Sequence, residues 1–436
     1  MSVTTGGTAE SAPGSTTGST PGSTPGSTPG TAASGPAAGG VRRRAAYFAA
    51  AAAIVGLFLA ASSAPSPLYV VYQQLWGFTP TVLTVVFAVY VVGLLASLLV
   101  VGGLSDHVGR RPVLFGAILL EILALVLFVL AGDVVVLAVA RLLQGVATGV
   151  AMTTLGAALV DLESPAAPGR AGVVNSVVPT SGLALGALGC GALVEFGPSP
   201  TKFVYALLLV GMGLAAAVVA LMPETAARRP GALASLRPKV GVPPRLRAEV
   251  VPVVPVMIAS WALGGLYLSL GPSVAAGLFD LRNHLVGGFV VTLLCGIGSI
   301  TAFLLRRRPA VRLLAPAAAL LGLGTLVTLL GVTTGLVAVA ALGTVIAGVG
   351  FGAAALATFG TFARIAAPHE RGALFAVAYV ISYLAFSLPA VAAGFAGTAF
   401  GLRITAEVYA LVIVTLTAAA LVLRLALARR AASVRS

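Results

Sequence analysis

The charged residues inside long apolar stretches are the ones whose types could do chemistry. Glu121 and Arg141 lie in separate apolar runs, and Gln144 follows Arg141 by three residues. A charge in hydrocarbon is costly, so such residues face a cavity or a partner and often belong to an ion or substrate pathway. By helical rise, Glu121 lies roughly 15 Å and Arg141 roughly 11 Å from the outer ends of their helices, which allows the two to pair if their faces agree.

Two interpretations of Glu121 and Arg141 stay open. They take part in proton coupling or substrate handling, or they form a structural ion pair that locks two helices. Other chemistry is not indicated. The three histidines (His107, His284, His369) lie in loops away from paired cysteines, so we expect no bound metal. The sequence contains no Gly-rich phosphate-binding motif with a lysine, so we do not expect ATP as the energy source. We expect neither an enzyme nor a bound cofactor.

Composition defines the elements that must hold these residues. Of all residues, 58% are apolar and only 9% are charged, and mean hydropathy is +1.06, values typical of a membrane protein. The net charge of +14 would suggest nucleic acid in a soluble chain. Here the cations flank apolar runs, where they anchor helices at lipid headgroups, so we expect no nucleic-acid partner.

Twelve apolar runs are long enough to cross a bilayer, and each must be helical because unpaired backbone groups are not tolerated in hydrocarbon. We predict spans at 46–72, 80–102, 112–132, 134–160, 171–195, 203–222, 250–275, 285–305, 313–332, 335–361, 372–394 and 404–427.

Basic residues are distributed unevenly between the two sets of loops. The chain has 26 Lys and Arg residues, and all but four lie in one set of alternating loops and the tails; the exceptions are Arg141, Lys202, Arg282 and Arg403. Because basic loops stay on the cytoplasmic side, we expect a multi-pass protein of the plasma membrane with both termini in the cytoplasm.

We predict a disordered Gly/Ser/Thr/Pro-rich tail (1–40), a six-helix bundle (41–222), a basic linker (223–249), a second six-helix bundle (250–428) and a short tail (429–436). The two halves repeat. Gly145–Gly149 matches Gly348–Gly352, the loop 166–172 matches 366–372, and Ala64-Pro65-Ser66 matches Gly271-Pro272-Ser273. Matches in a shared order, with an even number of spans in each half, indicate a duplicated unit inserted with the same orientation.

The loop after the second predicted span has an ordered set of glycines and charges, in which Asp106 can pair with Arg110 or a helix N-terminus. Its defining residues are Gly102, Asp106, Gly109, Arg110 and Arg111. This pattern resembles the cytoplasmic loop signature of the major facilitator superfamily, apart from His107, where that family usually has Arg. The resemblance covers residues 41–436 and implies an all-α membrane protein with twelve helices in two pseudo-symmetric bundles.

A second match refines the resemblance. Arg141-x-x-Gln144-Gly145 is similar to a signature of proton-coupled members of the superfamily, and the chain is closest in motif to the twelve-helix drug/proton antiporters. The glycine ladder Gly182–Gly191 of the fifth span is also similar, but Ala187 stands where the antiporters have proline. Close helix packing explains the ladder equally well.

The resemblance implies a central cavity lined by the first, fourth, seventh and tenth spans. Together with the eleventh span, these carry the cavity candidates Ser62, Ser63, Ser66, Tyr69, Thr148, Trp261, Tyr267, Ser269, Phe351, Thr358, Tyr379 and Tyr383. A cavity of hydroxyls and aromatic rings suits a lipophilic molecule with few charges.

We therefore expect proton-driven efflux of a small lipophilic compound by alternating access, powered by the proton gradient and carried out by a monomer. A metabolite uptake symporter with Arg141 on a substrate anion, and a non-transporting scaffold or sensor, are the alternatives. We also expect Asp106 to Arg111 to act as a latch with Asp161 or Glu163, or with the helix that begins near Gly372.

Overall fold

The computed structural model describes residues 36–226, 229–238, 240–281, 283–367 and 370–433. The chain divides into two units, 1–42 and 43–436, which are described separately. Of the first unit only 36–42 are described, and they belong to the first helix, so most of the predicted tail (1–40) lies outside the described residues. The last predicted tail (429–436) is not a separate element, because the final helix continues to Ser433.

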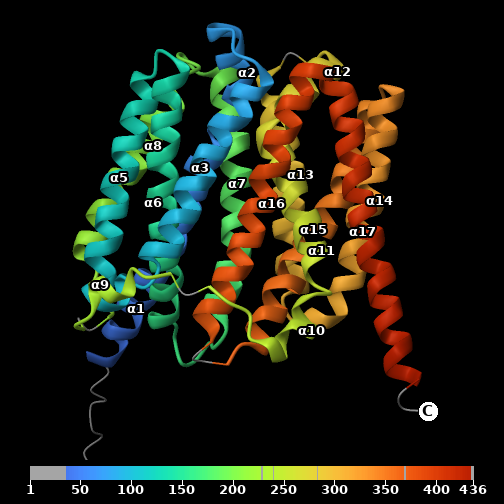
Figure 1. Cartoon of the computed structure of the whole chain (residues 1–436). Helices are drawn as coiled ribbons and strands as arrows, with labels where there is room; N and C mark the ends of the chain where they lie inside the picture. Colours follow the sequence, from blue (N-terminus) through green and yellow to red (C-terminus); the bar gives the residue numbers. More distant parts are fainter. Residues whose placement is uncertain (1–35, 227–228, 239, 282, 368–369, 434–436) are drawn as a thin grey trace, which may run out of the picture. The chain divides into compact units, whose positions relative to one another are not determined.

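All regular elements of the described residues are helical (Figure 1). They are α1 (Pro36–Ser63), α2 (Pro65–Trp76), α3 (Pro80–Val101), α4 (Ser105–Val108), α5 (Arg110–Leu130), α6 (Val134–Asp161), α7 (Arg170–Phe196), α8 (Phe203–Leu221), α9 (Ala232–Ser235), the 3-10 turn η1 (Pro244–Leu246), α10 (Arg247–Val250), α11 (Val254–Ser269), α12 (Gly271–Phe279), α13 (His284–Leu305), α14 (Ala310–Thr334), α15 (Val337–Ile365), α16 (Arg371–Phe400) and α17 (Leu402–Ser433).

Eleven helices of the described part are long and apolar enough to cross a membrane, or twelve if a bent pair counts as one span. The bent pair joins Pro244–Val250 to Val254–Ser269 at an angle of 59°. The seventh predicted span (250–275) is therefore not one straight helix. Pro252 and Pro255 lack the N–H donors that a continuous helix would use, which explains the bend.

Breaks also occur at the repeated proline motif. α2 and α12 begin at Pro65 and Gly271, and each has proline in its first turn. Proline fits the first turn of a helix but removes a hydrogen bond from a continuous one. The repeat found in the sequence thus marks equivalent breaks in the first and seventh spans.

The spans pack in two groups. α3, α5, α6 and α8 pack together, as do α13, α14, α15 and α17. The first group also includes α7, which contacts α6 and α8, and α2, which contacts α7; the second also includes α11, α12 and α16, which all contact α17. The groups meet where α7 packs on α13 and α3 packs on α16. The helices of residues 43–436 lie side by side, and α9 and α10 lie at the same end of them, α9 against α4 and α10 against α15 (Figure 1). Arg110, the first residue of α5, and Arg364, in the last turn of α15, belong to this end. We call this the arginine-rich end.

Candidate functional site

Arg141 lies inside the N-terminal group of helices and is only 1% exposed. Its Nε donates to the Tyr69 hydroxyl at 2.9 Å, and its Nη1 donates to the Ser62 carbonyl at 2.9 Å and to the Gln144 Oε1 at 2.8 Å. Because no water is available in hydrocarbon, a buried guanidinium is stable only when such acceptors surround it.

Aromatic rings enclose the same guanidinium. Its central carbon lies 5.3 Å from the ring centres of Tyr69 and Tyr90 and 5.9 Å from that of Phe128. The Tyr90 hydroxyl donates to Ser62 at 3.0 Å. Ring faces are electron-rich, so they stabilise a cation where water is excluded.

Gln144 connects Arg141 to Glu121. The Gln144 side-chain nitrogen donates to Glu121 Oε1 at 3.0 Å and to the Ala61 carbonyl at 3.2 Å. No nitrogen of Arg141 comes within ion-pair distance of the Glu121 carboxylate, so the direct pairing allowed by their depths does not form. Glu121 Oε2 is buried and has no hydrogen-bond partner among the described residues. We call this chain of three side chains the relay.

Thr148 lies one helical turn beyond Gln144. Its hydroxyl donates to the Gln144 carbonyl at 2.8 Å and lies 3.4 Å from the Ser62 hydroxyl. The cavity candidates Ser62, Tyr69 and Thr148 therefore belong to the buried surroundings of the relay, and their exposed fractions are all 5% or less.

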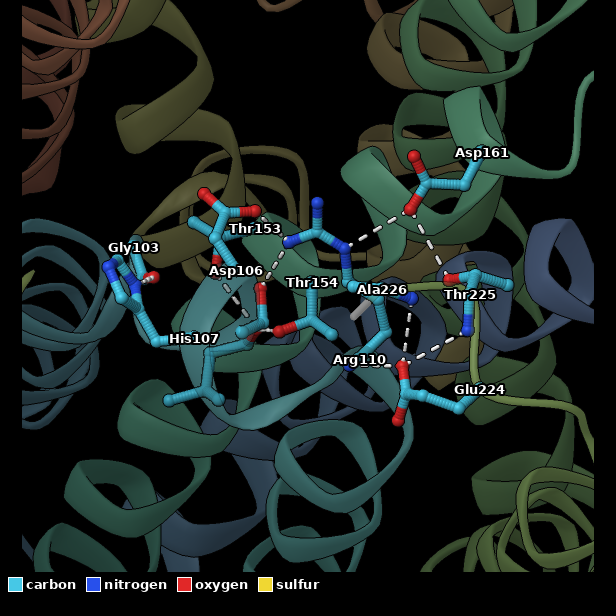
Figure 2. A network of polar contacts seen from close by, with 12 residues as sticks. Gly103, Asp106, His107, Arg110, Thr153, Thr154, Asp161, Glu224, Thr225 and Ala226 are labelled. Atoms are coloured by element: carbon cyan, nitrogen blue, oxygen red, sulfur yellow. Dashed lines mark hydrogen bonds and ion pairs between the residues drawn. The ribbon is translucent and has the colours of Figure 1, made fainter. Parts of the chain in front are cut away.

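Figure 2 shows a second polar network, at the arginine-rich end. Arg110 pairs with Asp106, donates to the Ser105 hydroxyl at 2.7 Å, and lies 3.3 Å from Asp161 Oδ2. Asp161 also accepts from the Thr225 hydroxyl at 3.3 Å. The expected contact between the loop and Asp161 is present, and it lies within the N-terminal group of helices.

Glu224, which the sequence analysis missed, completes this network. Its carboxylate accepts from the backbone N–H of Arg110 at 2.7 Å and of Arg111 at 3.1 Å, so it caps α5. A negative group is favourable at a helix N-terminus. Gly109 has φ +111°, and a Cβ there would lie 2.6 Å from Glu224, which explains the glycine. The only signal in the sequence was an isolated acid directly after a predicted span.

The two other latch candidates lie elsewhere. Glu163 accepts from the Ala171 N–H at 3.0 Å and so caps α7. Gly372 is exposed, and nothing lies within 4 Å of a Cβ placed on it. It makes no contact with Asp106 in this structure, so that contact stays a prediction for another conformation.

Four aromatic residues line one face of α16 and meet two more from α11 and α15. Ring centres lie 5.0 Å apart for Trp261 and Tyr383, and 5.5 Å apart for Phe359 and Tyr379. We call the set the aromatic ladder: Phe375, Tyr379, Tyr383, Phe386, Trp261 and Phe359. All six are only partly buried, and the hydroxyls of Tyr379 and Tyr383 donate to no other described residue.

Of three further cavity candidates, Ser66 and Tyr267 belong to neither the relay nor the ladder, whereas Phe351 lies beside the ladder: a Cβ on Gly264 would lie 3.3 Å from Phe351 and 3.5 Å from Phe386. Ser66 donates to the Leu268 carbonyl at 2.7 Å and so joins α2 to α11. Tyr267 is hydrogen-bonded to Thr344 at 2.8 Å inside the C-terminal group of helices. Phe351 packs against Gly264 and Gly298, whose missing side chains make room for its ring.

A family model described as "Major Facilitator Superfamily" matches residues 46–390. The chain belongs to this superfamily. It is a multi-pass membrane protein and a secondary transporter of small molecules rather than an enzyme, as the sequence predicted.

Three solved structures share the superfamily fold with this chain. The human organic anion transporter MFSD10 (TETRAN) is 17% identical, with 86% of this chain and 98% of that one covered and a TM-score of 0.63. A bacterial homolog of the human lysosomal transporter Spinster, in an inward-facing conformation, is 14% identical, with 87% of this chain and 96% of that one covered and a TM-score of 0.68. The peptide transporter POT in complex with alafosfalin is 15% identical, with 88% of this chain and 94% of that one covered and a TM-score of 0.68.

In this member of the superfamily the two groups of helices are joined at the end opposite the arginine-rich one. There Thr81 and Thr398 hydroxyls lie 2.8 Å apart, and Ser273 donates to Gln73 at 3.2 Å. Glu195 accepts from the His284 backbone N–H at 3.0 Å, between α7 and α13. The aromatic ladder lies on the arginine-rich side of these contacts, where Phe386 meets Phe87 at 5.1 Å.

Proposed function

We propose that this transporter couples proton movement to the export of a small lipophilic compound by alternating access. The observation that carries the coupling is the relay, which holds a carboxylate with an unpartnered oxygen at 0% exposure beside a fixed cation. Proton binding there changes the local charge by one unit. A proton that moves down the membrane potential supplies about 2.3 kcal/mol per 100 mV.

Arg141 acts in this proposal as a fixed charge that tunes Glu121 through Gln144. Its donors are already directed at Tyr69, Ser62 and Gln144, and it is almost fully buried. A substrate anion would have to displace these partners. This geometry disfavours the alternative of an uptake symporter that holds a substrate carboxylate on Arg141.

The aromatic ladder is the surface that we propose for the substrate. It offers partly exposed ring faces and two phenol hydroxyls, on the arginine-rich side of the contacts that join the opposite ends. Such a surface gains free energy from apolar burial and ring stacking, and the hydroxyls orient the ligand. With the arginine-rich end in the cytoplasm of a plasma-membrane protein, the substrate enters from inside the cell and leaves outside.

Purified protein in liposomes tests the coupling. A lipophilic fluorescent dye and an internal pH indicator report substrate and proton flux under an imposed pH gradient. We expect Glu121→Gln to abolish proton-driven dye movement while the variant stays folded and binds the dye. Glu407→Gln removes a carboxylate from another span, where it pairs with Arg403, and serves as the control. Full coupled transport in Glu121→Gln would refute the role of the relay.

A further inference from the structure

An apolar cavity of about 340 Å³ lies inside the C-terminal group of helices. It is lined by residues of α11, α12, α13, α14, α15 and α17, and none of the aromatic ladder lines it. Its wall includes Leu266, Val290, Leu329, Ala341 and Ala406, with no charged residue among the lining side chains. The volume falls within the range of about 300–1,000 Å³ that small-molecule sites occupy.

The few polar groups in the wall are already hydrogen-bonded. Tyr267 and Thr344 hydroxyls lie 2.8 Å apart, and Thr344 donates to the Ala340 carbonyl at 3.0 Å. The Tyr409 hydroxyl donates to the Ala262 carbonyl at 2.7 Å. A polar ligand would find no free donor here, and water needs two or more polar partners to occupy a cavity. The cavity therefore suits hydrocarbon.

The internal repeat explains why the space exists. When Gly145 is paired with Gly348, Arg141 corresponds to Thr344 and Gln144 to Ala347. In the N-terminal group of helices, the equivalent interior is filled by some of the largest fully buried side chains of the described residues, among them Arg141 and Tyr69. Much smaller side chains at the matched positions leave the C-terminal interior open.

The cavity reaches the exposed surface of the helices. Phe289 and Val337 both line it, and their exposed fractions are 48% and 43%. Both lie on spans, and Phe289 is roughly 8 Å along α13 from its end, a depth at which a bilayer holds acyl chains. The hydrocarbon nearest to this opening is the tail of a membrane lipid.

We propose that this cavity binds one acyl chain of a membrane phospholipid, inserted from the bilayer between α13 and α15. The lipid is a resident ligand that fills the C-terminal interior, not the transported compound. The inference concerns a different site from the ladder, so it stands whether or not the proposed direction and coupling are correct.

Photolabelling in vesicles tests the proposal. The full chain is reconstituted in phosphatidylethanolamine and phosphatidylglycerol with a small share of phosphatidylcholine that carries a diazirine in one acyl chain. After illumination, labelled peptides are mapped by mass spectrometry. We expect label on residues of the cavity wall that face inward, such as Leu266 and Leu329.

Two variants fill the cavity, and one serves as a matched control. Ala341→Phe and Ala406→Phe place a ring in the wall, whereas Ala338→Phe puts the same ring on the exposed face of α15. We expect the wall label to fall about tenfold in the filled variants, which corresponds to about 1.4 kcal/mol of binding free energy. The control should keep it. Thermal unfolding of each variant shows whether it is folded. If one of the two filled variants does not fold, the labelling of the other one tests the proposal.

Three outcomes would overturn the proposal. One is label confined to surface positions outside the cavity wall, such as Phe303 and Leu342. Another is wall label that Ala341→Phe and Ala406→Phe leave unchanged in folded protein. The third is wall label from a diazirine-bearing alkane without a headgroup but none from the phospholipid, which would make the occupant a free apolar molecule.

Discussion

At the scale of single residues, the planar guanidinium of Arg141 is the feature that the relay depends on. It serves Tyr69, Ser62 and Gln144 at once. An ammonium group at the same place is a point charge without this fork, so Arg141→Lys should leave acceptors unpaired. We expect a loss of about 1.5–3 kcal/mol in stability for each hydrogen bond to the charge that is lost. Thermal unfolding in detergent measures it.

Arg424→Lys is the control for that substitution, because Arg424 is partly exposed on α17 and its one hydrogen bond to another described residue is to the Val311 carbonyl at 3.4 Å. It should change stability little. If Arg141→Lys unfolds at the same temperature as the wild type, the guanidinium geometry is not what holds the relay together.

The sequence predicted part of this residue-scale arrangement. It identified Glu121 and Arg141 as embedded charges and placed them at compatible depths, because helical rise converts residue number into depth. It could not give the rotation of α5 and α6 about their axes. That rotation decides that Gln144 Nε2, and not Arg141, meets Glu121. The aromatic ladder was found only in part, because its ring contacts join α15 and α16 to α11, which is distant from them in sequence.

At the scale of elements, the start of α5 combines a positive φ at Gly109, which glycine adopts without strain, with a cap from the linker. Gly109→Ala should destabilise the protein by more than about 1 kcal/mol, because the positive φ is unfavourable and the new Cβ meets Glu224. Gly116→Ala, seven residues later in the same helix, has open space at its Cβ and should be neutral or stabilising. Thermal unfolding of the pair is the measurement, and equal effects would contradict this account of Gly109.

Element boundaries were predicted well where polar residues or proline punctuate the apolar runs. Asp133 caps α6 through two backbone N–H groups at 2.8 and 2.9 Å, one residue before the predicted span. The matched prolines at Pro65 and Pro272 showed the repeat, but hydropathy alone did not show that they break the first and seventh spans. Hydropathy counts apolar residues and does not register a missing backbone donor.

At the scale of the whole molecule, the linker between the halves contacts both of them at the arginine-rich end. The Arg229 N–H donates to the His107 carbonyl at 2.9 Å, in the N-terminal half. Farther along, Arg245 pairs with Glu370, and Glu249 lies 2.8 Å from Arg364, both in the C-terminal half. The first part of the linker thus binds the N-terminal half and its last part binds the C-terminal half. When this end opens or closes, the backbone between these two parts must change conformation.

In alternating access, one end of the molecule opens when the other closes, and cysteine pairs at the two ends test this directly. Cys190 and Cys295, both buried and free, are first replaced by alanine. Cysteines at 81 and 398 should then form a disulfide readily, since the threonine hydroxyls there lie 2.8 Å apart, and should stop transport until reduced. Cysteines at 106 and 372 should cross-link only in protein that is free to leave this conformation. Disulfide formation at 106 and 372 that proceeds equally well with the 81–398 bond in place would show that the loop does not respond to the state of the opposite end.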